Sequence, residues 1–168
     1  MPKKEVTDKK RHVDHREHRY SISEPKNDDP TLVVCPKCEK MAKVFLSDTQ
    51  PKIEFSVKVV CSNCGFVKQK TTNEREFYWY EDDPSDSFFG YKLWMKTSCC
   101  GNSLWAFNHR HLEFIESFVQ AELRENPKDN LGYFNSSLVS RLPKWIKSGK
   151  NRKRILEGLA KLRALGEL

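Results

Sequence analysis

Four of the six cysteines in this 168-residue chain occur in two short motifs of identical spacing. The motifs are CPKC, with Cys35 and Cys38, and CSNC, with Cys61 and Cys64. A Cys-x-x-Cys turn lets two thiolates reach one ion, and two such turns supply the four sulfur atoms of a closed tetrahedral zinc site. Gly65, after the second motif, can adopt backbone conformations that a side chain disfavours. We therefore expect Cys35, Cys38, Cys61 and Cys64 to hold one structural zinc ion.

Three other uses of these cysteines compete with zinc. The same four sulfur atoms could hold an iron centre. Redox-active pairs are an alternative, but such a motif normally opens a helix within a βαβ unit, and neither motif does so here. Disulfides are the third. The N-terminus has no apolar stretch after its basic residues, so it is not a secretory signal, and we expect a cytoplasmic protein with reduced thiols.

Two segments between the motifs, MAKVFL (41–46) and KIEFSVKVV (52–60), alternate apolar and polar residues, as half-buried strands do. LVV (32–34) leads into the first motif, and FVKQK (66–70) follows the second. The 22 residues between the motifs suit a hairpin that returns the chain to the first pair. A segment of about 40 residues cannot build much core, so the bound ion would supply most of its folding free energy.

CPKC, the alternating strands and CSNCG together resemble the zinc-ribbon superfamily, over about 40 of the 168 residues. That resemblance implies a structural zinc module that docks on nucleic acid or on another protein, without catalysis by the ribbon. The segments LWAFNHRHLEFIESFVQAELRE and SRLPKWIKSGKNRKRIL resemble small bacterial proteins known only by their zinc ribbon. This second resemblance implies a bacterial or phage source and no particular activity.

The fold expected is α+β, in three parts. Residues 1–30 form a flexible basic arm, residues 31–70 the zinc ribbon, and residues 71–168 a module of short antiparallel strands and about three helices with basic C-terminal helices. The arm is polar and nearly free of apolar residues, so we expect it to order only on a partner. Within it, His12, His15 and His18 would share one face of a helix, where a metal-binding or pH-sensing role is an alternative.

The third part has six predicted elements. FYWY (77–80) predicts an aromatic strand, and residues 88–108 predict two strands around a turn at 100–103. Asn108 is a candidate N-cap for a helix from His109 to about Glu125. A helix over about 136–148 would be interrupted by Pro143, and a last helix spans about 151–165. We expect the aromatic residues of this part to form core rather than a stacking surface.

Basic residues are concentrated at the C-terminal end. The chain has a net charge of +7, and residues 141–168 alone carry nine basic and two acidic residues. Such a run can neutralise phosphates, although it contains no pattern that reads particular bases. An acidic protein surface and a solvated helix face are the alternatives. The candidate nucleic-acid-binding residues are Arg141, Lys144, Lys147, Lys150, Arg152, Lys153 and Arg154.

Two smaller groups could also carry chemistry. Cys99 or Cys100 with His109 and His111 could form a second metal site, although packed free thiols are the simpler reading. We expect the start of the helix at His109 to be solvated, and a bound phosphate or carboxylate is the alternative. The other group is an acidic loop. If the protein were a metal-dependent nuclease, the carboxylates of this loop would be its candidate metal ligands. Its members are Glu81, Asp82, Asp83 and Asp86.

Catalytic motifs are absent from the sequence: it has no Gly-rich phosphate loop, no Gly-x-Ser-x-Gly and no His-Glu-x-x-His. No apolar run approaches the roughly 20 residues of a membrane helix. We expect a non-catalytic zinc-ribbon protein that binds nucleic acid non-specifically, or that recruits or regulates a nucleic-acid-processing complex. A protein–protein adaptor or accessory subunit without nucleic-acid contact is the alternative, followed by the metal-dependent nuclease.

Overall fold

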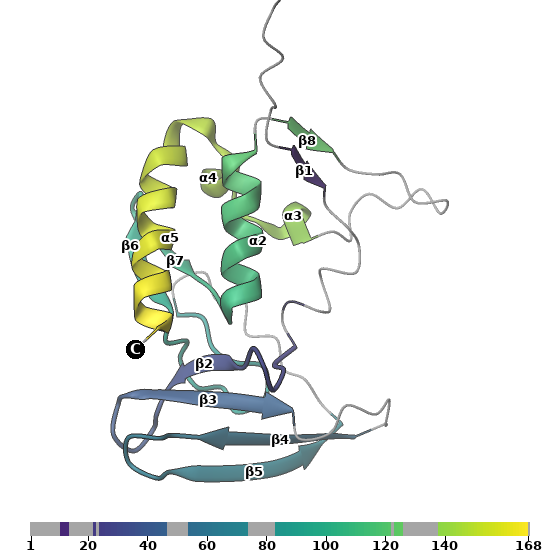
Figure 1. Cartoon of the computed structure of the whole chain (residues 1–168), viewed down its shortest axis with the longest axis vertical. Helices are drawn as coiled ribbons and strands as arrows, with labels where there is room; N and C mark the ends of the chain where they lie inside the picture. The colour runs from purple at the N-terminus through teal and green to yellow at the C-terminus, as the bar shows by residue number, and fades with distance from the viewer. Residues whose placement is uncertain are drawn as a thin grey trace, which may run out of the picture.

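A computed structural model of the chain describes residues 11–13, 22, 24–46, 54–73, 83–121, 123–125 and 138–167. A four-stranded antiparallel sheet lies at one end, and two helices stand over it next to a two-stranded hairpin (Figure 1). A second two-stranded sheet lies at the far end of the helices. The predicted α+β fold class is confirmed. The strand predicted at 77–80 lies outside the described residues.

The large sheet is the predicted ribbon. Its strands follow chain order: β2 (Thr31–Val34), β3 (Met41–Leu46), β4 (Phe55–Val60) and β5 (Val67–Thr72). Each pairs antiparallel with the next, with Val33 opposite Ala42 and Val57 opposite Lys70. Apolar residues at every second position make one face of the sheet, so Val57 and Val59 are fully buried.

A segment outside the ribbon extends the sheet at β2. Leu93 forms a β-bridge with Val33, and the Trp94 N–H donates to the Leu32 carbonyl at 2.9 Å. Phe88, Leu93 and Phe107 then pack with the buried face of the ribbon in one core. The edge of β2 is thereby paired, and the ribbon shares its core with the rest of the chain.

A second core lies between a hairpin and two helices. The hairpin is β6 (Lys96–Cys99) and β7 (Asn102–Trp105), and the helices are α2 (His109–Gln120) and α5 (Arg152–Gly166). The two helices stand side by side against the hairpin (Figure 1). The turn and the last helix agree with the sequence prediction to within a few residues, whereas the first strand begins at Lys96 and not near residue 88. The fully buried residues of this second core include Met95, Leu104, Leu112, Phe118, Ile155 and Leu159.

Helix α2 begins as predicted, with Asn108 as its N-cap. The Asn108 side chain accepts a hydrogen bond from the His111 N–H at 2.9 Å. The carboxylate of Asp29 accepts from the N–H groups of His109 and Arg110 at 3.0 and 3.1 Å, and from Arg110 Nε at 2.7 Å. A carboxylate of the same chain therefore occupies this helix start, where we expected a solvated end with a bound anion as the alternative.

The end of α2 differs from the prediction: the helix stops at Gln120, whereas we expected it to reach about Glu125. Ala121 has an extended backbone, and its carbonyl accepts a hydrogen bond from the Arg152 guanidinium at 2.9 Å. Residues Leu123–Glu125 form strand β8 instead. A contact from a distant residue thus satisfies the carbonyl that a longer helix would have bonded internally.

Strand β8 pairs in parallel with β1 (Arg11–Val13). His12 therefore lies in a strand, and the shared helix face predicted for the three histidines is wrong at this residue, while His15 and His18 lie outside the described residues. The His12 ring contacts the edges of Phe114 and Phe118 and hydrogen-bonds Ser117 Oγ at 2.9 Å. Described parts of the predicted arm thus pack on α2, while the three-part division of the chain stays a prediction.

The C-terminal region contains short helices before α5. They are α3 (Leu138–Arg141), α4 (Lys144–Lys147) and the 3₁₀ turn η2 (Gly149–Asn151). Pro143 separates α3 from α4, because its ring cannot continue a helix and its backbone is extended at ψ 150°. The interruption predicted at this proline is confirmed, and the cations around it do not share one helix.

The contact between Asp29 and α2 can be tested by mutation. We expect Asp29→Ala to lower the free energy of unfolding by about 2 kcal/mol, because it leaves two helix N–H groups and Arg110 Nε without their acceptor, although the Arg110 guanidinium keeps its bond to the Glu24 carbonyl. Asp28→Ala is the matched control, since Asp28 is exposed. Urea unfolding followed by circular dichroism measures both variants. Equal losses in the two would contradict this role for Asp29.

Candidate metal centre

The four motif cysteines meet between two hairpin turns. Cys35 and Cys38 lie in the turn between β2 and β3, and Cys61 and Cys64 lie in the turn between β4 and β5. The first cysteine of each turn is buried and the second is half-buried. The antiparallel register of β3 with β4 places both turns at the same end of the sheet.

The two turns have the same backbone geometry. In the first, the Cys35 N–H donates to the Lys40 carbonyl at 2.7 Å, and the Glu39 N–H donates to the Cys35 carbonyl at 3.0 Å. In the second, Cys61 bonds the Phe66 carbonyl at 2.8 Å, and the Gly65 N–H donates to the Cys61 carbonyl at 3.0 Å. The residue after each second cysteine has a positive φ, 60° at Glu39 and 71° at Gly65.

The sulfur positions fit one tetrahedral ion. All four Sγ atoms lie within 4.8 Å of one another. Across the two turns, Cys35 Sγ is 3.7 Å from Cys64 Sγ and Cys38 Sγ is 3.6 Å from Cys61 Sγ. Sulfur atoms bound to one tetrahedral zinc ion at about 2.3 Å lie about 3.8 Å apart. The four cysteines are free of disulfides, so all four sulfur atoms can act as ligands.

The electrostatics of the cluster favour a bound cation. The Lys40 N–H, together with the Asn63 side chain, lowers the pKa of the Cys38 thiol to about 6. Desolvation raises the pKa of the Cys64 thiol to about 12. Neighbouring sulfur atoms therefore differ in their tendency to ionise, and two thiolates at this distance would also repel each other. A divalent cation removes that repulsion and lets all four bind as thiolates.

Such a site would be closed. Four protein sulfur atoms complete a tetrahedron and leave no position for water or substrate, which is the arrangement of structural metal sites. The N–H groups of Lys37 and Asn63 Nδ2 point at Cys35 and Cys38 Sγ, at 3.4 and 3.5 Å, and would stabilise their charge. The arrangement suits holding two hairpins together rather than chemistry on a ligand.

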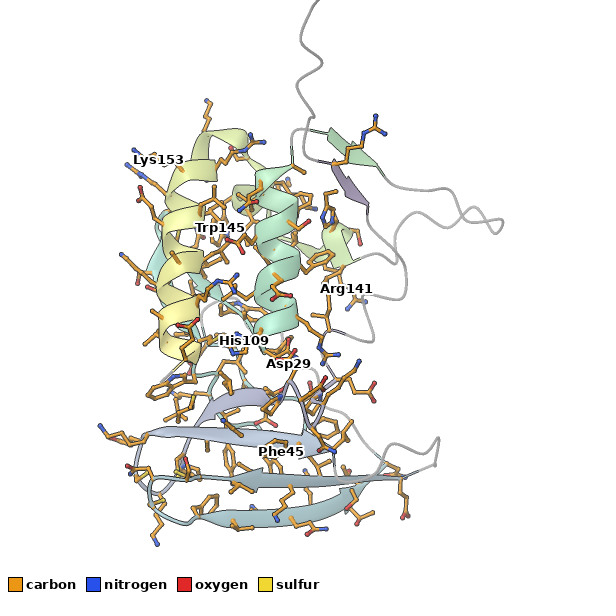
Figure 2. All side chains as sticks on the ribbon, viewed as in Figure 1. Asp29, Phe45, His109, Arg141, Trp145 and Lys153 are labelled. Atoms are coloured by element: carbon orange, nitrogen blue, oxygen red, sulfur yellow. The ribbon has the colours of Figure 1, made fainter. Side chains whose placement is uncertain are left out.

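The seven predicted nucleic-acid-binding residues fall into three groups. Arg141, Lys144 and Lys147 line a cavity beside α3 and α4. Arg152 is half-buried, and its guanidinium bonds the end of α2, so its role is structural. The third group is exposed around the start of α5, where Figure 2 shows Lys153 on the side away from α2. It consists of Lys150, Lys153 and Arg154.

The suggested second metal site is not assembled. Among the described residues, the only group of three or more potential metal ligands is the motif cysteines. Cys99 Sγ lies 3.6 Å from Cys100 Sγ and 3.5 Å from the Arg154 carbonyl, so this pair packs against α5. The buried His111 uses Nδ1 to accept from the Phe107 N–H at 3.3 Å. Packing thus accounts for both cysteines.

The described acidic residues of the loop have structural partners. Asp86 is buried and accepts hydrogen bonds from the N–H groups of Phe88, Phe89 and Tyr91 at 3.0, 2.8 and 2.7 Å. Burial raises the pKa of its carboxyl group, against these bonds. Asp83 pairs with Lys92 and Lys96, which lower its pKa. Glu81 and Asp82 lie outside the described residues.

One cluster of basic and aromatic side chains was not anticipated from the sequence. The turn held by Asp86 stacks Phe89 on Tyr91, with ring centroids 5.5 Å apart and planes 9° apart. Lys68 and Lys70 of β5 place their Nζ atoms 5.9 and 5.3 Å from the Phe89 ring centroid. About 20 residues separate the two halves of this cluster, so only the packing of the loop on the ribbon brings them together.

Comparison with known proteins adds no family to this picture. No protein-family profile matches the chain, and neither a curated protein nor a solved structure shows significant similarity to it. Within the described residues, no helix combines the length and apolar character needed to cross a bilayer. The metal centre is therefore argued from its own geometry.

The positive φ at Gly65 predicts a specific cost of substitution. We expect Gly65→Ala to lower the free energy of unfolding of the metal-bound protein by about 1 kcal/mol, because a Cβ disfavours this conformation although nothing lies within 4 Å of it. Gly149→Ala is the matched control, since its Cβ would also meet open space and its φ is not positive. Thermal unfolding compares them. Equal stability of both variants would contradict the conformational argument.

Proposed function

We propose that this chain is a non-catalytic zinc-ribbon protein that binds nucleic acid through its phosphates, without reading base sequence. One structural zinc ion on Cys35, Cys38, Cys61 and Cys64 would hold the ribbon. Four thiolates in a closed site favour zinc, and iron with the same ligands is the alternative. The observation that carries nucleic-acid binding is the exposed cation cluster around the start of α5.

That cluster has no competing use among the described residues. Lys150, Lys153 and Arg154 are exposed, and none of them forms an ion pair with a described carboxylate. Cations that pair within a protein are neutralised, whereas these three remain available to phosphates. Lys153 and Arg154 lie on α5, whose buried residues Ile155 and Leu159 anchor it in the core, and Lys150 lies in the preceding turn η2. The cluster is therefore a fixed patch of positive charge on a rigid element.

A nuclease is not favoured by the geometry. Asp86 is saturated by three backbone N–H groups, and Asp83 by two lysines. Neither carboxylate is left to bind a catalytic metal ion. The adaptor alternative has no comparable observation in its favour, and the binding experiment below separates it from nucleic-acid binding.

Metal content tests the first part of the proposal. We expect one zinc per chain by elemental analysis of the native, reduced protein, and its loss in Cys61→Ser, because three sulfur atoms hold the ion less tightly. Cys100→Ser is the matched control and should keep its zinc, since Cys100 lies outside the cluster. A chelator should also remove amide exchange protection from β3 and β4. Iron, or no metal at all, in the native protein would contradict the zinc assignment.

Charge reversal tests the second part. We expect the triple variant Lys150→Glu, Lys153→Glu, Arg154→Glu to lose single- and double-stranded binding, and the slope of log Kd against log salt to become shallower by about 2–3. The control reverses Lys26, Lys43 and Lys161, three exposed lysines scattered over the fold, for the same change in net charge. Fluorescence anisotropy across a salt series measures both. Failure of the wild-type protein to bind DNA or RNA at any salt concentration would favour the adaptor.

A further inference from the structure

A cavity of about 700 Å³ lies between β7, α2, α3 and α4, and the proposed function so far makes no use of it. Its walls include Trp105 from β7, His111 and Ile115 from α2, and Trp145 from α4. The volume is in the range of small-molecule sites, and an apolar lining with a few polar groups is typical of them.

The charged groups of the cavity are all of one sign. Arg141 and Lys144 line it from α3 and α4 and are exposed, and Lys147 lines it with its Nζ bonded to the Ser140 carbonyl at 3.1 Å. None of the described lining residues is a carboxylate. A ligand that used these groups would therefore be an anion, and Arg141 and Lys144 would offer it solvent-facing cations.

One polar group in the wall, the imidazole of His111, has a fixed orientation and an unused hydrogen-bond donor. His111 is 3% exposed, and the Phe107 N–H donates to its Nδ1 at 3.3 Å, which places the ring proton on Nε2. Within the described part of the chain, Nε2 has no hydrogen-bond partner. The rings of Trp105 and Phe107 contact the imidazole at 5.5 and 5.3 Å between centroids and hold its orientation. Burial lowers the pKa of His111 to about 4, so it is a neutral donor near pH 7.

We propose that this cavity binds one nucleobase together with the phosphate of its nucleotide. The base would lie against Trp105 and Trp145 and accept a hydrogen bond from His111 Nε2, while Arg141 and Lys144 would hold the phosphate. This inference rests on the proposed function and names the part of the nucleic acid that the cavity takes. A planar aromatic group that carries an anion matches apolar aromatic walls beside cations and no carboxylates.

The same chemistry has two sources, a free nucleotide and a nucleotide within a single strand. A base inside a duplex is stacked on both faces and cannot enter a cavity, so an unpaired base is required. The exposed cluster of Lys150, Lys153 and Arg154 would bind the backbone of either form of nucleic acid. The cavity thus predicts that single strands bind more tightly than duplexes of the same length.

The test compares two cavity variants with a surface control in the full chain. Trp145→Leu removes the aromatic wall, and Lys144→Glu reverses an exposed cation at the cavity without altering the core. Lys161→Glu is the matched charge control on the exposed face of α5. Anisotropy of a labelled 12-nucleotide single strand measures affinity. Adenosine and uridine 5′-monophosphate serve as competitors, and a 12-base-pair duplex serves as the comparison.

We expect Trp145→Leu to weaken single-strand binding about tenfold or more and Lys144→Glu about fivefold, with Lys161→Glu within about twofold of wild type. Duplex binding should change little in Trp145→Leu. Competition by monophosphates at micromolar concentration would support the cavity as a free-nucleotide site. Loss of strand binding in the cavity variants without such competition would support a base of a strand. If Trp145→Leu does not fold, the cavity inference is tested by comparing the single-strand affinities of Lys144→Glu and Lys161→Glu.

The failures are separable. Wild-type binding of single strands that neither cavity variant weakens would overturn the cavity inference and leave the proposed function intact. Monophosphate binding that the cavity variants abolish, without any strand binding, would support the site and contradict the wider proposal. Binding of neither ligand by the wild-type protein would overturn both.

Discussion

Four sulfur atoms within 4.8 Å of one another set the conditions for the rest of this fold. As thiols they gain little from their proximity, and as thiolates they repel one another, so the charged cluster requires a cation. A cation bound there joins the turn that follows β2 to the turn that follows β4. That junction would add to the register that the buried, alternating apolar residues of the sheet already specify.

The ribbon in turn positions everything that follows it, through β2. This strand faces two cores at once: Val33 packs into the ribbon, while Leu32 packs against the core of α2 and α5. The outer edge of β2 bonds residues 92–94, and the Leu32 N–H donates to the Phe107 carbonyl at 2.9 Å. Because Phe107 immediately precedes the N-cap of α2, the start of that helix is tied to the sheet that carries the four cysteines.

The cations of the chain are divided by this packing into structural and available ones. Arg110 pairs with Asp29, Arg163 pairs with Glu116 at 2.6 Å, and Arg152 bonds the end of α2. These three guanidiniums join segments far apart in sequence, which suits their several fixed donors. Lys92 and Lys96 pair with Asp83, whereas Lys150, Lys153 and Arg154 are exposed. Part of the positive charge is neutralised within the fold, so the net charge of +7 is not spread evenly over the surface.

Features that depend on local chemistry were predictable from the sequence alone. Both Cys-x-x-Cys turns, the alternating strands, the N-cap at Asn108 and the break at Pro143 follow from residues close together in the chain. The remaining features depend on contacts between residues that are far apart in sequence, so only the tertiary structure shows them. Asp29 reaches Arg110 across 81 residues, and Arg152 ends α2 early. No local sequence pattern predicts that Trp105, His111 and Trp145 line one cavity, because only the packing of β7, α2 and α4 brings them together.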